Sequence, residues 1–239
     1  SKGYTPNSFA DQARTCLHHH PPEVSERGPS DFQLNPELGA EGSLDDLRPA
    51  AVLIPVVARD SLTVILTQRT AHLSTHAGQI AFPGGKLDDG ESVAETALRE
   101  AEEEIGLSER FVDPIGYLDW YRTRTGFAVS PLVALVQPGF SLQANPNEVE
   151  DIFEVPLEFL LDESNHVTHR RRWKGRRPGA RPDGHLRGHA AGGPATGILP
   201  PVPGRLPPKH RRRTREGLLL HPDAVAVLSP FPGQLRNPE

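Results

Sequence analysis

The sequence predicts an α/β fold of the α+β kind, in which helices cover a mixed β-sheet to form a sandwich. Two apolar, β-branched runs of strand length, at residues 51–57 and 62–66, come first. A single long run of strong helix formers follows at residues 92–104, and further apolar runs of strand length come after it. Strands, one long helix and then more strands are typical of a sheet with helices packed against its faces.

The segments before the long helix predict a hairpin and a tight turn. Asp60 and Ser61 separate the first two apolar runs and are typical turn residues. Residues 79–82 lead into a Pro-Gly-Gly sequence at 83–85, directly before the helix formers. We therefore expect the chain to turn sharply just before the helix.

The long helix has recognisable signals at both ends. Ser92 and Glu95 have the spacing of a capping box, which predicts the start of the helix, and Gly106 stands where a left-handed cap would end it. Apolar residues recur at helical spacing and predict a buried stripe. The stripe consists of Ala94, Ala97, Leu98, Ala101 and Ile105. After the helix we expect strands at 115–120, 127–136 and 149–155, then a short helix at 156–161 with proline in its first turn.

Charge divides the chain into parts. Residues 1–169 carry 11 Lys or Arg and 27 Asp or Glu, whereas residues 170–239 carry 15 and 4, together with 22 Pro or Gly among 70 residues. Basic sequence rich in Pro and Gly lacks the apolar periodicity that a packed core needs. We predict an N-terminal extension at 1–48 with a short helix near 8–17, a folded domain at 49–169, and a basic tail at 170–239 that is disordered or frameshifted.

Three glutamates crowd one face of the long helix. Glu100, Glu103 and Glu104 are at positions i, i+3 and i+4, where like charges destabilise a helix by roughly 0.2–0.5 kcal/mol per pair. A bound hard cation such as Mg²⁺ would reverse the sign of that interaction, because it prefers carboxylate oxygens. A solvated acidic helix face explains the same pattern, so charge alone leaves both interpretations open.

The residues around these glutamates resemble the sequence motif of the Nudix hydrolases. Gly85, then Glu91, then residues 99–107 (Arg-Glu-Ala-Glu-Glu-Glu-Ile-Gly-Leu) match every fixed position of the Nudix box. The resemblance implies a Nudix-type α/β/α sandwich. It also implies an enzyme that uses Mg²⁺ or Mn²⁺ to cleave nucleoside diphosphates linked to another group.

The resemblance also assigns roles to individual residues. Glu100, Glu103 and Glu104 would be metal ligands, and Glu103 or a loop glutamate would deprotonate the attacking water. Arg99 and Glu91 would orient the carboxylates. Gly84 and Gly85 would let the backbone pass close to the helix and the ligand. A further acidic ligand is expected outside the box, with Glu148 as the first candidate and Glu150 as the second.

The segment before the box resembles the coenzyme A pyrophosphatase branch of the family. The matching positions include Arg69, Gly78 and the Phe-Pro-Gly-Gly sequence at 82–85, but Ser74 replaces a second arginine of that signature. Serine cannot supply the bidentate fork that arginine offers to a phosphate. The implied reaction splits coenzyme A into 3′,5′-ADP and 4′-phosphopantetheine, with other nucleoside diphosphate derivatives as alternative substrates. His72, His76 and Gln79 would either contact the substrate or pack in the loop.

The tail does not continue the family pattern. The branch should end with an aromatic-rich strand and a last helix, whereas Arg, Pro, Gly, Ala and His dominate here, as in GC-rich coding DNA read in a wrong frame. We expect the tail from about Arg172 to be frameshifted or otherwise non-homologous, and the last helix to be missing or altered. Binding of nucleic acid through the arginines is the rival interpretation, which the near absence of aromatic residues disfavours. A non-catalytic nucleotide-binding module is a further alternative.

Composition excludes several further classes of protein. Cys16 is the only cysteine, which excludes an internal disulfide and a cysteine-based zinc site. The longest apolar run, residues 50–58, is too short to span a membrane, and no secretory signal opens the chain. We therefore expect a cytoplasmic protein with a small-molecule substrate, without membrane or nucleic acid as partner. Three consecutive histidines at 18–20 precede two prolines and are expected to form a solvated loop.

Overall fold

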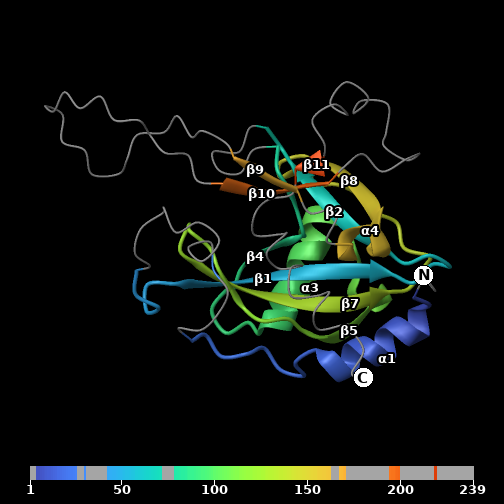
Figure 1. The fold of residues 1–239 in the computed structure, drawn as a ribbon, viewed down its shortest axis with the longest axis horizontal. Coiled ribbons are helices and arrows are strands. Elements are labelled where there is room, and N and C mark those ends of the chain that lie inside the picture. The colour runs from blue at the N-terminus through green and yellow to red at the C-terminus, as the bar shows by residue number, and fades with distance from the viewer. Residues whose placement is uncertain are drawn as a thin grey trace, which may run out of the picture.

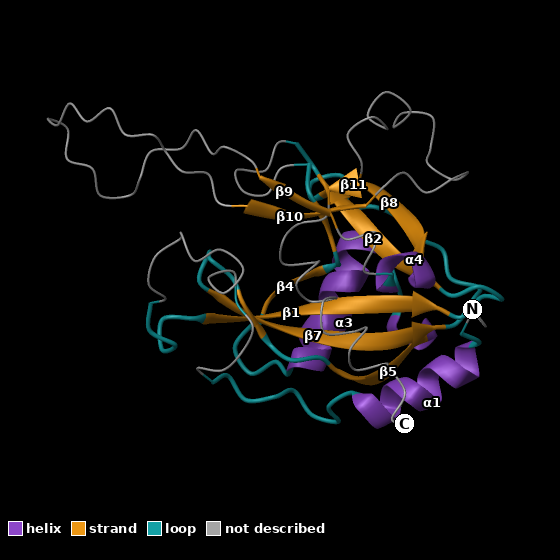
Figure 2. Ribbon diagram, in the orientation of Figure 1, coloured by secondary structure: helices purple, strands orange, loops and turns teal. Residues whose placement is uncertain are grey.

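A central sheet with helices on both faces forms the body of the molecule (Figures 1 and 2). The computed structural model describes residues 4–25, 30, 42–71 and 78–162, and the backbone of three strands at 167–170, 194–199 and 218–219. The sheet has eight strands, with the order β3-β2-β1-β7-β5. In addition, β4 pairs with β1, β6 with β7 and β8 with β2. The strands are β1 (Arg48–Val57), β2 (Thr63–Arg69), β3 (Ile80–Ala81), β4 (Gly84–Lys86), β5 (Val112–Tyr117), β6 (Tyr121–Arg122), β7 (Phe127–Val136) and β8 (Val149–Pro156).

β1 is the strand around which the site is organised. One of its edges pairs in parallel with β7 over the whole length, from Arg48 opposite Phe127 to Val57 opposite Val136. Its other edge is shared: β2 pairs with its last residues across the predicted hairpin, and β4 pairs with residues 50–52. This division brings β4, and with it the start of the long helix, against the first half of β1.

Alternation along the strands separates two apolar cores, as the pleat of a β-strand requires. Leu53 of β1 belongs to the core under the long helix α3 (Val93–Ile105), whereas Ile54 belongs to the core on the opposite face. That opposite face is covered by α1 (Pro6–Cys16) and α4 (Leu157–Leu161). The predicted sandwich is therefore confirmed, and the predicted strands and short helices are present with small changes in their ends.

The signals at the ends of α3 act as predicted. The Ser92 side chain accepts a hydrogen bond from the Glu95 backbone while Glu95 accepts one from the Ser92 backbone, and Gly106 has a φ of 67°. The buried stripe was partly wrong. Ala97, Ala101 and Ile105 are buried, but Ala94 is only partly buried and Leu98 is half-buried beside a surface pocket. Leu98 lies at the edge of the stripe, between the side of the helix that packs on the sheet and the side that faces solvent.

The N-terminal segment contributes more to the core than the sequence suggested. Phe9, Ala10 and Ala13 of α1 are buried, and so is Leu17. Leu17 and His18 then lie against β5 at Gly116, where a Cβ atom would be 2.8 Å from Leu17 Cβ. β5 also begins earlier than predicted and ends at Tyr117, so residues 118–120 are not strand.

Three further strands form a separate sheet in the order β11 (Leu218–Leu219), β10 (Pro194–Leu199) and β9 (Val167–Arg170), and β9 spans the end of the predicted domain and the first residue of the predicted tail. The other residues of the predicted basic tail lie outside the described residues, and the prediction of disorder or a frameshift stays a prediction. Within the described chain, α4 is the last helix. None of the described helices has the length and apolar character that crossing a membrane requires.

Candidate active site: a carboxylate cluster held by two arginines

Two glycines allow α3 to approach the sheet. A Cβ atom on Gly84 would collide with the Ala51 carbonyl oxygen and with Val52, and one on Gly85 would collide with the Glu100 carboxylate. Both glycines lie in β4, so the strand can pass between β1 and the helix only because they have no side chain. Glycine is needed at both positions because the packing is close, and the Glu100 carboxylate lies directly against the backbone of Gly85.

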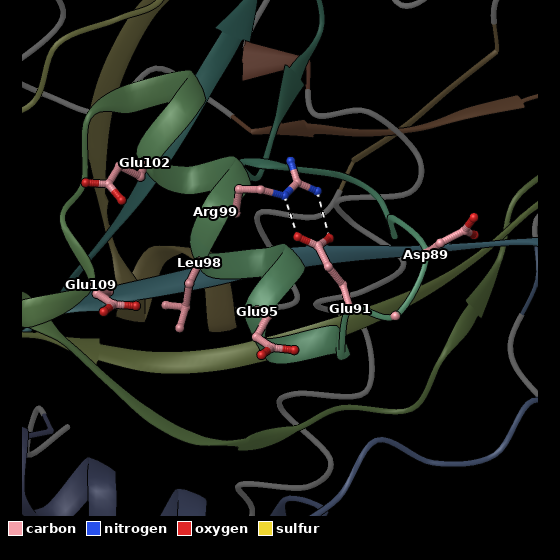
Figure 3. A pocket seen from close by; sticks show the side chains of 8 residues that line it. Asp89, Glu91, Glu95, Leu98, Arg99, Glu102 and Glu109 are labelled. Atoms are coloured by element: carbon pink, nitrogen blue, oxygen red, sulfur yellow. Dashed lines mark hydrogen bonds and ion pairs between the residues drawn. The ribbon is translucent and has the colours of Figure 1, made fainter.

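Arg99 connects the predicted catalytic residues. Its Nε and Nη2 atoms donate to the two oxygens of Glu91 at 2.8 and 3.0 Å, the bidentate arrangement seen in Figure 3. Its Nη1 atom donates to Glu100 Oε1 at 3.0 Å and to Glu103 Oε2 at 3.2 Å. Its Nη2 atom also donates to the Lys86 carbonyl oxygen at 3.3 Å. One guanidinium therefore fixes three carboxylates and the end of β4 relative to one another.

Glu91 is held as a carboxylate. The hydrogen bonds from Arg99, with that of the Thr96 hydroxyl at 2.8 Å, lower the pKa of Glu91 to about 2. The Asp88 backbone N–H donates to the same Oε2 atom at 3.2 Å. Glu91 is therefore ionised at neutral pH, and its role in this geometry is to hold Arg99 rather than to exchange a proton.

The pKa of Glu104 is shifted in the opposite direction, toward the protonated form. Its side chain is only 3% exposed, and it accepts hydrogen bonds from the Gly84 N–H at 3.3 Å and from Arg69 Nη1 at 3.5 Å. Burial raises the pKa of Glu104 to about 8, and repulsion from Glu100 and Glu148 adds to the rise. Arg69 and the Gly84 N–H act in the other direction but are too weak to offset burial.

Glu100 and Glu103 complete the helix cluster. Burial raises the pKa of Glu100, and the Arg99 hydrogen bond lowers it less than burial and repulsion from Glu103 and Glu148 raise it. The Glu103 side chain is 58% exposed, against 16% for Glu100. Glu103 is thus the member of the cluster with the freest access to water.

A loop brings Glu148 to the same place. The Asn145 N–H donates to the Glu104 carbonyl oxygen at 2.8 Å, and the Thr70 N–H donates to the Glu148 carbonyl oxygen at 2.9 Å. These bonds tie the loop to the end of α3 and to the end of β2. Repulsion from Glu148 raises the pKa of Glu100 and of Glu104, whereas Glu150 is an exposed residue of β8.

Two of the predicted substrate-binding residues, Arg69 and Gly78, lie at the end of β2, whereas Gly84 and Gly85 lie in β4. The Arg69 N–H donates to the Gln79 carbonyl oxygen, and the Gly78 N–H donates to the Arg69 carbonyl oxygen, with Gly78 at a φ of 69°. In the described part of the chain, Arg69 Nε is buried without a hydrogen-bond partner. Ser74, together with the two histidines of the same segment, lies outside the described residues.

The comparison with known proteins agrees with this geometry. Residues 47–175 match the NUDIX domain family. The chain belongs to the Nudix family. A Photorhabdus laumondii protein named as an uncharacterized Nudix hydrolase, NudL, is 46% identical over 136 residues, which cover 56% of this chain and 73% of the relative. A protein of Escherichia coli O1:K1 with the same name is 46% identical over 134 residues, covering 55% of this chain and 69% of the relative.

Among solved structures, the chain is similar to a Caenorhabditis elegans Ap4A hydrolase in a binary complex. It has a TM-score of 0.40 and 21% identity, and the match covers 47% of this chain and 82% of that one. The match to the NUDIX domain family and the similarity to the two NudL proteins identify the protein as a Nudix pyrophosphohydrolase, an enzyme class that generally uses divalent metal ions.

The donor set of this Nudix cluster suits a hard cation. Its carboxylate oxygens are the ligands that Mg²⁺ and Mn²⁺ prefer, and burial, together with repulsion between the glutamates, raises the pKa of Glu100 and of Glu104. Among the described residues, no three His, Cys, Asp or Glu side chains are already arranged as a metal centre. Arg99 donates hydrogen bonds to Glu100 and Glu103, and Arg69 donates one to Glu104.

Two features were not foreseen from the sequence. Thr96 is fully buried and holds Glu91, and its only sequence signal is a polar residue beside the apolar stripe of the helix. A pocket of about 490 Å³ lies along the outer side of α3 (Figure 3). Its lining residues are Asp89, Gly90, Glu91, Glu95, Leu98, Arg99, Glu102 and Glu109. It shares the Glu91–Arg99 pair with the cluster but contains none of the predicted metal ligands.

Proposed function

We propose that this Nudix enzyme hydrolyses the diphosphate linkage of coenzyme A or its derivatives, giving 3′,5′-ADP and 4′-phosphopantetheine. The observation that carries the proposal is the position of Arg69, which stands at 3.5 Å from the buried Glu104 and has a buried Nε without a partner among the described residues. Arg69 belongs to the segment that resembles the coenzyme A pyrophosphatase branch. An arginine left partly unsatisfied beside a carboxylate cluster is suited to bind a phosphate oxygen.

In this proposal the carboxylates have different roles, which follow from how deeply each is buried. Glu100, Glu104 and Glu148 would hold Mg²⁺ or Mn²⁺, and the bound ion would neutralise the diphosphate and lower the pKa of the attacking water. Glu103, the most exposed member, would accept the proton of that water as its oxygen forms a bond to phosphorus. The P–O bond of the anhydride breaks, and the second phosphate leaves with the electron pair. Arg99 and Glu91 would keep these groups in register.

Arg69 would bind the diphosphate on the side of the sheet that carries α3. Ser74 stands where the branch signature has a second arginine, so this chain has one fewer cation for the same task. We expect a weaker hold on the diphosphate than two arginines would provide. This departure also keeps another nucleoside diphosphate derivative, such as a dinucleotide or a nucleotide sugar, as the second candidate substrate.

A substrate panel tests the proposal. Coenzyme A, ADP-ribose and a diadenosine polyphosphate are each incubated with the full chain and Mg²⁺ or Mn²⁺, and the products are identified by mass spectrometry. We expect 3′,5′-ADP and 4′-phosphopantetheine in equal amounts from coenzyme A, at the highest kcat/KM of the panel. Faster hydrolysis of another substrate would assign the enzyme to that substrate, and binding without turnover would indicate a non-catalytic module.

A further inference from the structure

A change of register between β2 and β8 decides which residue meets the end of β2. The antiparallel pairing is regular as far as Gln68, which is opposite Asp151, but the next residue, Arg69, is opposite Val149. Glu150 is therefore an extra residue of β8, and the two strands, which lie side by side in Figure 1, continue one residue out of the earlier register. Such bulges change which residue faces a given partner, and they are frequent beside active sites.

The shift brings Glu148 to Thr70, the residue that follows β2. With regular pairing Val149 would be opposite Thr70, whereas here the Thr70 N–H donates to the Glu148 carbonyl oxygen at 2.9 Å. The Thr70 hydroxyl donates to the carbonyl oxygen of the preceding residue, Asn147, at 3.3 Å. Thr70 is only 5% exposed. It therefore bonds two consecutive carbonyl groups of the turn that carries Glu148.

The other end of this turn, residues 145–148, is bonded to α3. The Asn145 N–H donates to the Glu104 carbonyl oxygen at 2.8 Å. Within the turn, the Asn145 side-chain oxygen accepts from the Asn147 N–H at 3.1 Å, and the Glu148 N–H donates to the Asn145 carbonyl oxygen at 3.0 Å. A side chain that bonds to the backbone two residues later is typical of an asparagine that fixes a turn. The turn is thus held between the helix that carries the glutamates and the strand end that carries Arg69.

The charge of Glu148 opposes this arrangement. Burial is the main cause of the raised pKa of Glu100 and of Glu104, and repulsion from Glu148 contributes to both. Like charges in a partly buried site repel one another more strongly than they do in water. A turn without fixed ends could relieve that repulsion by moving away. The bonds from Thr70 and Asn145 therefore hold Glu148 near carboxylates that repel it.

We infer that Thr70 is a positioning residue, whose hydroxyl holds the turn at 145–148 so that Glu148 stays at the carboxylate cluster and can contact a divalent cation. The inference rests on the proposed function, because that proposal makes Glu148 a ligand of Mg²⁺ or Mn²⁺. Groups that orient a metal ligand without touching the metal change the metal affinity when they are removed. Thr70 would act in this way through the backbone of Asn147 and Glu148.

Matched substitutions separate this role from a general effect on stability. Thr70→Val removes the hydroxyl and keeps the shape of the side chain, and Thr70→Ser keeps the hydroxyl. Thr67→Val is the control, because Thr67 is also buried in β2 and its hydroxyl donates to a backbone carbonyl oxygen, that of Ala81, at 3.1 Å. Ala81 belongs to β3 and not to the turn. The two valine variants lose the same kind of bond, so their thermal midpoints should fall by similar amounts.

Mn²⁺ binding to the full chain is the deciding measurement. Electron paramagnetic resonance detects the free aqueous ion, so the affinity is obtained without substrate. We expect Thr70→Val to bind Mn²⁺ about tenfold more weakly than the wild type, a modest loss because the Thr70 N–H still bonds to Glu148. Thr70→Ser and Thr67→Val should bind Mn²⁺ as tightly as the wild type. An unchanged affinity in Thr70→Val, or an equal loss in Thr67→Val, would overturn the inference.

A double-mutant cycle with Glu148→Gln distinguishes the inference from the proposed function. If Thr70 acts through Glu148, Thr70→Val should weaken Mn²⁺ binding no further in the Glu148→Gln background. The same loss in both backgrounds would refute the role of Thr70 and leave Glu148 as a ligand. An unchanged affinity in Glu148→Gln alone would remove Glu148 from the proposed ligand set and overturn the inference with it. If coenzyme A is not hydrolysed, the proposed substrate fails while the Mn²⁺ result still supports the inference.

Discussion

The buried Glu104 provides a direct test of how the site is assembled. The pKa of Glu104 is about 8 in the folded chain without metal, against an ordinary value of 4.5. Between these two pH values the folded chain keeps a proton on Glu104 that the unfolded chain has released. The contribution of Glu104 to stability is therefore fully present below pH 4.5 and is lost as the pH rises through 8. Such a pKa difference corresponds to an upper bound of about 5 kcal/mol. Relaxation and water entry reduce that cost, so we expect about 2–4 kcal/mol.

Glu104→Gln removes this cost and keeps an oxygen for the Gly84 N–H. Chemical unfolding with EDTA present should show the variant about 2–4 kcal/mol more stable than the wild type at pH 9, and nearly equal to it at pH 5. Glu102→Gln, which removes the same charge from an exposed position of α3, should change stability by less than about 0.5 kcal/mol. If Glu104→Gln is less stable than the wild type at pH 9, or if the difference in their free energies of unfolding does not depend on pH, then ionisation of the buried Glu104 does not destabilise the fold.

Three further outcomes follow from the same contacts. Thr96→Val deletes the hydroxyl that donates a hydrogen bond to Glu91, and it should lower kcat about tenfold and the free energy of unfolding by about 1–3 kcal/mol. Thr96→Ser keeps the hydroxyl and should retain both values. Equal activity of the two variants would contradict this. Gly85→Ala places a methyl group against the Glu100 carboxylate, and steady-state kinetics should show at least a hundredfold loss of kcat, which an unchanged rate would refute. Mg²⁺ should raise the thermal midpoint of the wild-type chain but not of Glu104→Gln, as measured by calorimetry with and without EDTA, and equal shifts would remove Glu104 from the ligand set.

The position of the helix could be predicted because the information is local. Capping residues, the left-handed glycine and the spacing of the glutamates all lie within one continuous segment, and the structure confirms the start and end of α3 there. The hairpin of β1 and β2 was also predictable, since short-range turn chemistry defines it. These features depend on contacts between residues close in sequence.

The remaining features depend on contacts between distant segments. Nothing in the α1 sequence shows that Phe9 and Leu17 fill the core beside β5, because an amphipathic helix does not specify its partner. The difference between Glu104 and Glu103 was equally hidden, since burial against β4 distinguishes two adjacent glutamates. Leu98 was misplaced for the same reason, as a helical wheel gives the direction of a side chain but not the extent of the surface that covers it.

The most direct test of the central claim is the rate of coenzyme A hydrolysis by Glu103→Gln compared with Glu102→Gln and the wild-type chain. The assay is run with saturating Mg²⁺, and the appearance of 3′,5′-ADP is followed. We predict that Glu103→Gln loses at least about a hundredfold in kcat with little change in KM, while Glu102→Gln retains the wild-type rate. Equal rates for the two variants would contradict the assignment of this carboxylate cluster as the site of diphosphate hydrolysis.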